Sequence, residues 1–273
     1  MTRIFTPIML ALLALLVSAA VPATDAHAAE PTWSDVGRWE RFEGVIANPK
    51  PYRDPFADVS LEVTYQSPDG RTVKFWGFHD GGRTWRFRFM PDTLGTWSYQ
   101  AAFSDGTPGA SGKFECVASS VPGPIARNQD NPLWVGRKDG DPVLLRSLHV
   151  GDRLFAGDFA PAKRKAFLDW AGRQGYNMLT VASPAVDPAA AAGRARAGRN
   201  TPNLWPLAPE PYRQFERNLD DLSARRMVVL PFADLFGRGT DLPRDSKDQT
   251  RFLKYALAPV SYTHLTLLTN REV

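Results

Sequence analysis

The feature that most constrains the fold is the segment 84–89, which reads Thr-Trp-Arg-Phe-Arg-Phe. In an extended chain its three aromatic residues share one side, while the threonine and the two arginines share the other. Alternation with a period of two residues, combined with large aromatic side chains, is typical of a strand that buries one face. We therefore expect a half-buried β-strand here.

The segments on either side of this strand carry the same kind of pattern. Residues 71–77 and 95–103 also alternate aromatic or β-branched residues with polar ones, and glycine-containing turns at 79–83 and 91–95 separate the three segments. We expect three consecutive strands at the centre of one antiparallel sheet. With further strands at 40–46, 59–65 and 112–117, the pattern predicts an Ig-like β-sandwich over residues 30–120.

A run of Ser, Val, Pro and Gly at 119–124 predicts a boundary, and the periodicity changes after it. Short apolar strands then alternate with helical segments, which favours a parallel sheet with right-handed crossovers. The apolar run 143–150 is expected to be the second strand of a hairpin, buried on both faces. Further strands are expected at 176–182 and 227–233. A first helix is expected to open at Pro161, with Phe167, Trp170 and Ala171 at core-facing spacing. Two more helices are expected, one over 212–222 with Tyr212, Phe215, Leu219 and Leu222 on one face, and one over 250–257.

The order of strands and helices fits either a doubly wound sheet or a (β/α) barrel. No glycine-rich phosphate loop follows the first strand, which favours the barrel. A barrel needs eight units and only three fit into residues 121–258. Residues 259–273 have no helical period and resemble a translated adapter sequence, so we expect a non-native tail, an authentic short strand being the alternative. The expected fold class is a β-sandwich followed by an incomplete α/β TIM-barrel domain.

The first 28 residues predict a secretory signal peptide. Arg3 precedes an apolar run at 8–21, and Ala26-His27-Ala28 fits a cleavage site. The run is short for a permanent membrane helix, and no other segment approaches membrane-spanning length. We expect a secreted or periplasmic protein that makes no membrane contact after cleavage.

The composition of the chain limits the binding partners and the catalytic groups that can be expected. The net charge of +4 is spread among interleaved acidic and basic residues, whereas nucleic-acid binding requires clustered charge, so no nucleic-acid partner is expected. Cys116 is the only cysteine, and its place beside Phe114 favours a buried structural thiol over a nucleophile. Outside the leader and the extreme C-terminus only His79 and His149 remain, so neither a metal site nor a cofactor is expected, and any chemistry must rely on carboxylates.

Several motifs resemble a known family arrangement. Trp-Gly-Phe-His-Asp-Gly at 76–81, Arg-Phe-Arg-Phe-Met-Pro at 86–91 and Gly-Thr-Trp-Ser-Tyr at 95–99 are similar to the β-sandwich of unknown function that precedes bacterial glycoside hydrolase barrels. The segments 164–170 and 231–234 resemble, more weakly, the first units of retaining, apiosidase-like or cellulase-like barrels.

The resemblance implies an exported hydrolase of polysaccharides or oligosaccharides that uses two carboxylates. In such barrels the acid/base residue follows the fourth strand and the nucleophile lies on a later strand, so both are expected beyond Ala258. We expect this chain to be inactive by itself and the authentic protein to continue. A non-catalytic carbohydrate-binding or structural β-sandwich module is the alternative.

Barrel active sites gather at the carboxyl ends of the strands, which selects the candidate substrate-binding residues. His149 ends the first strand and could donate to a sugar hydroxyl, or it could be a satisfied core histidine. Asn177 lies early in the second strand, where a structural role is favoured. Asp234 closes the third strand and either binds sugar or caps its loop. Asn203 and Trp205 lie in the long second loop, where the indole could stack on a sugar ring or enter the core.

Overall fold

The computed structural model describes residues 34–128, 130–131, 133–138, 142–150, 152–155, 159–181, 205–230, 243 and 245–260. All of these belong to one compact unit, residues 33–273. The segment 1–33, with the whole expected signal peptide (1–28), and residues 261–273 of the expected tail lie outside the described residues.

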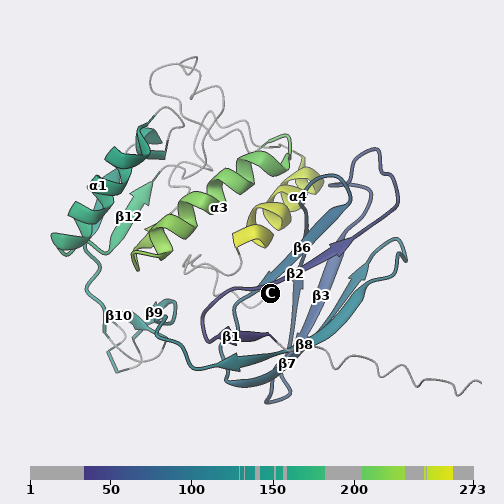
Figure 1. The fold of residues 1–273 in the computed structure, drawn as a ribbon, viewed down its shortest axis with the longest axis horizontal. Helices are drawn as coiled ribbons and strands as arrows, with labels where there is room; N and C mark the ends of the chain where they lie inside the picture. Colours follow the sequence, from purple (N-terminus) through teal and green to yellow (C-terminus); the bar gives the residue numbers. More distant parts are fainter. Residues whose placement is uncertain are drawn as a thin grey trace, which may run out of the picture. The chain divides into compact units, whose positions relative to one another are not determined.

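The first sheet has five strands in the order β1-β8-β7-β3-β4 (Figure 1). Neighbouring strands are antiparallel, except that β1 runs parallel to β8. Along β7 the side chains of Trp97, Ala101 and Phe103 are buried, as alternation predicts. The strands are β1 (Asp35–Gly37), β8 (Ala110–Val117), β7 (Gly95–Phe103), β3 (Leu61–Gln66) and β4 (Thr72–Trp76).

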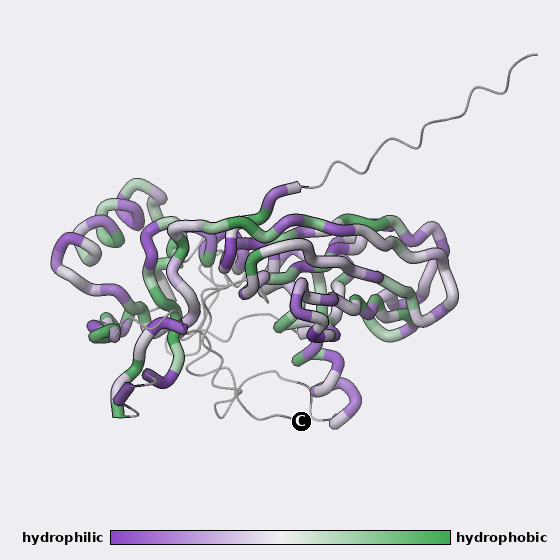
Figure 2. The backbone as a smooth tube through the Cα atoms, turned by 90° about the horizontal axis from the view of Figure 1, so that it is seen from below, coloured by the Kyte–Doolittle hydropathy of each residue, from purple (hydrophilic) through white to green (hydrophobic). Residues whose placement is uncertain are grey.

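The second sheet has three antiparallel strands in the order β2-β6-β5. Its apolar side faces the first sheet, and the two share a core that contains Trp85, Phe87, Trp97 and Phe114. Figure 2 shows how hydrophobic and hydrophilic residues follow one another along the backbone. The strands are β2 (Phe42–Ala47), β6 (Thr84–Phe89) and β5 (Phe78–His79).

The expectation that three consecutive strands form the centre of one sheet was wrong. β4 and β7 belong to the first sheet and β6 to the second. The chain changes sheets at Gly77, whose amide donates to the Leu61 carbonyl and where a Cβ would lie 2.4 Å from a Leu61 methyl carbon. The expected reversal at 79–83 does form, but it joins β5 to β6, with Gly81 and Gly82 at positive φ.

The second half of the described chain contains a parallel sheet, β11-β12-β13, and three helices. The fold is β-rich, and the described residues contain no closed barrel. A short antiparallel ribbon precedes the parallel sheet. The elements are β9 (Ile125–Arg127), β10 (Val135–Arg137), β11 (Ser147–Val150), η1 (Asp152–Phe155), α1 (Pro161–Arg173), β12 (Met178–Val181), α3 (Pro209–Ser223), β13 (Val228–Leu230), α4 (Ser246–Leu257) and η2 (Ala258–Val260).

Two expectations about this half need correction. Of the expected hairpin over 133–150 the structure keeps one antiparallel bridge, between Gly136 and Pro142, while the strands themselves pair as β10 with β9 and β11 with β12. β11 is not buried on both faces, because its residues alternate between exposed and core-facing positions. Its residues Ser147 and His149 are exposed. On α1 the core-facing residues are Leu168 and Ala171, whereas Trp170 is 43% exposed, since residues three apart share a helix face and Trp170 falls beside it.

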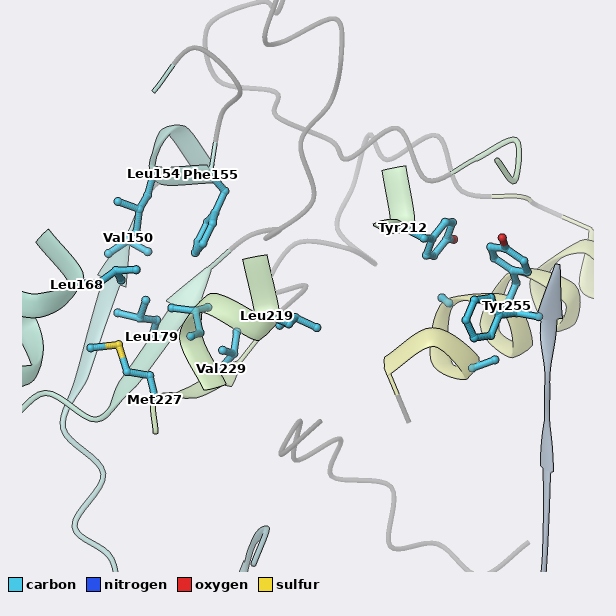
Figure 3. Close-up of a cluster of buried hydrophobic side chains, with 14 of the residues drawn as sticks. Val150, Leu154, Phe155, Leu168, Leu179, Tyr212, Leu219, Met227, Val229 and Tyr255 are labelled. Carbon is cyan, nitrogen blue, oxygen red and sulfur yellow. The ribbon is translucent and has the colours of Figure 1, made fainter. Parts of the chain in front are cut away.

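A second core lies between the parallel sheet and the helices (Figure 3). It contains Leu179 and Val229 from the strands and Leu168 from α1, and it continues to Tyr212 and Tyr255. The same cluster includes Phe78 of β5. The second sheet of the sandwich and the α/β half are therefore joined by a shared apolar core.

Candidate functional site

The carboxyl edge of the parallel sheet is the first candidate site, because parallel α/β sheets bind ligands beyond the carboxyl ends of their strands. In register, Leu148 of β11 aligns with Leu179 of β12 and Val229 of β13, and this row packs into the core toward the helices. Side chains alternate between the faces of a strand. The neighbouring residues of β11, Ser147 and His149, therefore lie on the face opposite the helices.

That opposite face carries hydrogen-bonding groups. The hydroxyl oxygens of Ser147 and Thr180 lie 2.8 Å apart, and either hydroxyl can donate. His149 aligns with Thr180 in the register of the two strands, and its side chain is exposed. Imidazole and hydroxyl groups arranged in this way can bind the hydroxyls of a polar ligand. β11, β12 and β13 themselves contain no Asp or Glu, so the described strands supply no catalytic carboxylate.

Asn177 lies at the other end of the sheet, immediately before β12. Its Oδ1 accepts from the Arg146 amide at 2.8 Å, and its Nδ2 donates to the Leu144 carbonyl at 2.9 Å. Both ends of its amide therefore hold the backbone that leads into β11. His149 lies about three residues, or roughly 10 Å, further along the strand direction, so the structure does not bring these two candidates together.

Trp205 is half-buried and packs against the second core, with its ring centroid 6.3 Å from that of Phe252 in an edge-to-face arrangement. Asn203 and Asp234 lie outside the described residues. The substrate-binding roles of His149, Asn177, Asn203, Trp205 and Asp234 stay predictions.

Sequence reasoning missed the ion pairs made by the polar face of β6. Arg88 is 4% exposed. Its Nε lies 2.6 Å from Glu43 Oε2, and its Nη1 lies 2.7 Å from Glu216 Oε1 on α3 and donates to the Pro259 carbonyl at 2.7 Å. Burial raises the pKa of Glu216 more than the Arg88 guanidinium lowers it. Arg88 therefore crosslinks the sandwich to the helical half through a buried ion network.

A second ion network joins the β5–β6 turn to α3. Asp80 accepts from Arg86 Nε at 2.5 Å and from Arg213 Nε at 2.8 Å. Burial raises the pKa of Asp80, but the hydrogen bonds and charges of the two guanidinium groups outweigh it, so the pKa lies below its ordinary value. The alternation of Arg86 and Arg88 was visible in the sequence, but partners more than 120 residues away were not.

The described residues contain no group of three or more His, Cys, Asp or Glu side chains placed to hold a metal ion. Within the same part of the chain, no helix combines the length and the apolar character needed to cross a bilayer.

The fold is thus a β-sandwich packed on an α/β unit. The face of the parallel sheet opposite the helices carries the polar residues Ser147, His149 and Thr180. Residues 35–104, within the sandwich, match the family described as a domain of unknown function (DUF5060). No curated protein matches the chain in sequence at a significant level.

The structure is similar to that of a candidate glycoside hydrolase from Bacteroides vulgatus ATCC 8482, with a TM-score of 0.64 and 19% identity over 85% of this chain and 48% of that one. The chain therefore spans about half the length of that protein and shares its fold there. Weaker matches, both with a TM-score of 0.25, are the Lin-41 filamin domain (16% identity, 33% of this chain, 90% of that one) and a glycosyl hydrolase family 2 member from Bacteroides cellulosilyticus (12% identity, 71% and 23%).

Proposed function

We propose that this chain is part of an exported glycoside hydrolase that acts on polysaccharides or oligosaccharides. The observation that carries the proposal is the parallel sheet β11-β12-β13 packed beside a sandwich, in a fold shared with the B. vulgatus protein. In the proposed enzyme these strands are the first three of a (β/α)8 barrel, and residues 1–28 direct export.

The proposed mechanism uses two carboxylates on barrel strands that follow residue 258. One protonates the glycosidic oxygen while the other attacks the anomeric carbon or activates water, which requires carboxyl groups about 5 to 9.5 Å apart. His149 and Thr180, side by side on the exposed face of the sheet, would bind sugar hydroxyls near the reacting bond. They are substrate-binding residues in this proposal, and the proton transfers belong to the carboxylates.

The test is to express the full natural reading frame, including the codons that follow residue 258, and to measure release of reducing ends from plant and bacterial polysaccharides. His149→Ala is expected to lower kcat/KM about tenfold, the value of one hydrogen bond of about 1.4 kcal/mol. The matched control is Gln100→Ala, an exposed position on β7. If no glycan is cleaved and the later strands carry no carboxylate pair, the proposal fails.

A structural role is the second candidate function for the sandwich. Phe78 enters the second core, and the Arg88 and Asp80 ion networks join the sandwich to α3. A module that carried out independent glycan capture would not need buried contacts of this kind with its neighbour. If the sandwich is only a scaffold, we expect no glycan-array signal that is lost when exposed aromatic residues of the sandwich are replaced.

A further inference from the structure

A half-open cavity of about 80 Å³ lies where the sandwich meets α4, and none of its lining residues belongs to the parallel sheet. It is bounded by the segment 55–61, by residues 76–79 of β4 and β5 together with Trp85, and by one face of α4. Part of its wall is the Trp-Gly-Phe-His segment singled out in the sequence. A cavity of this size admits several waters or the edge of one small ring.

His79 lines this cavity and is 7% exposed. Its Nε2 lies 3.2 Å from the Gly82 carbonyl, and because a carbonyl only accepts, Nε2 carries the ring proton. Nδ1 is then an acceptor, and it is buried without a hydrogen-bond partner among the described atoms. With less than 1 Å² of accessible surface, this nitrogen is closed to groups that enter the cavity, so the aromatic wall and the charged rim decide which ligand fits.

The rest of the wall is aromatic on the inside and cationic at the rim. The Phe56 ring stands edge-to-face against both His79 and Tyr255, at centroid distances of 5.2 Å and 4.9 Å, so the inner wall is rigid. At the rim, the ammonium of Lys254 lies 5.1 Å from the centroid of the half-buried Trp76 ring. Arg251 also lines the cavity, whereas no carboxylate does.

Arg251 and Lys254 differ in whether a carboxylate of the protein pairs with their charge. Arg251 is paired with Asp248 at 3.3 Å and, more distantly, with Asp54 at 3.7 Å. Lys254 is exposed and forms no ion pair with a described residue. A ligand carboxylate at the rim would therefore meet one uncompensated cation, with a second cation adjacent to it.

We propose that this cavity binds the terminal residue of an acidic glycan, a hexuronate that enters edge-on. A carbon–hydrogen face of the sugar ring contacts Phe56 and Trp76, and the carboxylate pairs with Lys254. The cavity shares no lining residue with β11, β12 or β13, and binding there requires no hydrolysis.

The test uses the chain itself and measures saturation-transfer NMR with two probes, methyl glucuronide and methyl glucoside. The glucuronide is expected to bind at least tenfold more tightly, and Lys254→Met is expected to remove that preference while keeping the aliphatic contact with Trp76. Ser60→Phe, an exposed substitution at the cavity lining, is expected to abolish binding of both sugars. The matched control is Lys163→Met, an exposed lysine on α1.

Thermal unfolding of each variant establishes that it is folded before binding is compared. The proposal is overturned if neither sugar binds, if the glucoside binds as tightly as the glucuronide, or if Ser60→Phe leaves the signal intact. Because the readout is binding of a single sugar, its failure leaves the hydrolase assay unaffected, and a failed hydrolase assay leaves this one unaffected.

Discussion

Arg88 Nη1 on β6 lies 2.7 Å from Glu216 Oε1 on α3, and their side chains are only 5% and 13% exposed. Residues 128 positions apart in the chain thus form a buried ion pair between the sandwich and the helical half. Glu43 of β2 completes the network at 2.6 Å from Arg88 Nε. Buried ion pairs of this kind are costly to break, because the remaining partner keeps an uncompensated charge.

Replacing Arg88 with Met should therefore destabilise the protein strongly. We expect a loss of about 3 to 5 kcal/mol in the free energy of unfolding, measured by denaturant titration, because the buried carboxylate of Glu216 would lose its cation, whereas Glu43 keeps Arg86 as a partner. Adding Glu216→Leu to the same chain should recover part of the loss. Arg71→Ala, which breaks the exposed pair with Asp92, is the control and should cost at most about 1 kcal/mol. Equal effects of the two arginine substitutions would contradict a special role for Arg88.

Asp80 should make the stability of the folded protein depend on pH in the acidic range. Its pKa is lower in the folded state than in the unfolded chain, so its contribution is complete above the unfolded value, near 3.8, and is lost as the pH falls through the folded value. Asp80→Asn should cost about 1 to 2 kcal/mol from pH 7 down to about pH 4 and progressively less below that pH, as followed by thermal unfolding from neutral pH into strong acid. Glu216, with its raised pKa, acts in the opposite sense and loses its contribution as the pH rises. Glu62→Gln, at an exposed pair with Lys74, should have little effect at any pH.

Asn177→Ala should reduce stability rather than ligand binding. The substitution removes two solvent-exposed hydrogen bonds, to the Arg146 amide and the Leu144 carbonyl, and because water can replace the lost partner the cost should be about 1 kcal/mol. Denaturant titration measures this cost, with Gln100→Ala as the exposed control. Unchanged stability together with weakened binding of a glycan would instead assign Asn177 to sugar recognition.

The thiol of Cys116 should be inert in the folded protein. Its side chain is 2% exposed, and burial raises its pKa to about 11. Since thiolate is the reactive form, a disulfide reagent at pH 8 should modify the native chain very slowly and should titrate one equivalent after unfolding in guanidinium. The chain has a single cysteine, so the signal has one source. Rapid modification of the native protein would show that this part of β8 opens readily.

Local patterns were enough to locate most of the regular structure. Alternation placed the strand at 84–89, and β6 has these bounds. The spacing of Tyr212, Leu219 and Leu222 predicted a helix face, and all three side chains are buried on α3. The pairing of Phe114 with Cys116 on one side of a strand predicted a buried thiol, which the structure also has. These features depend on which side of an element is apolar, and that information lies within a few residues.

The partners of these elements could not be predicted in the same way. The alternation that defined β6 did not show that it joins β2 and β5 rather than β4, or that Arg88 on its polar side would be buried against Glu216. The sequence likewise placed His149 at the end of a strand, whereas only the fold decided that it lies exposed on an edge strand beside Thr180. An amphipathic pattern determines that a face is buried or polar, but strand order and ion pairing are settled by contacts between distant segments, which the tertiary structure alone brings together.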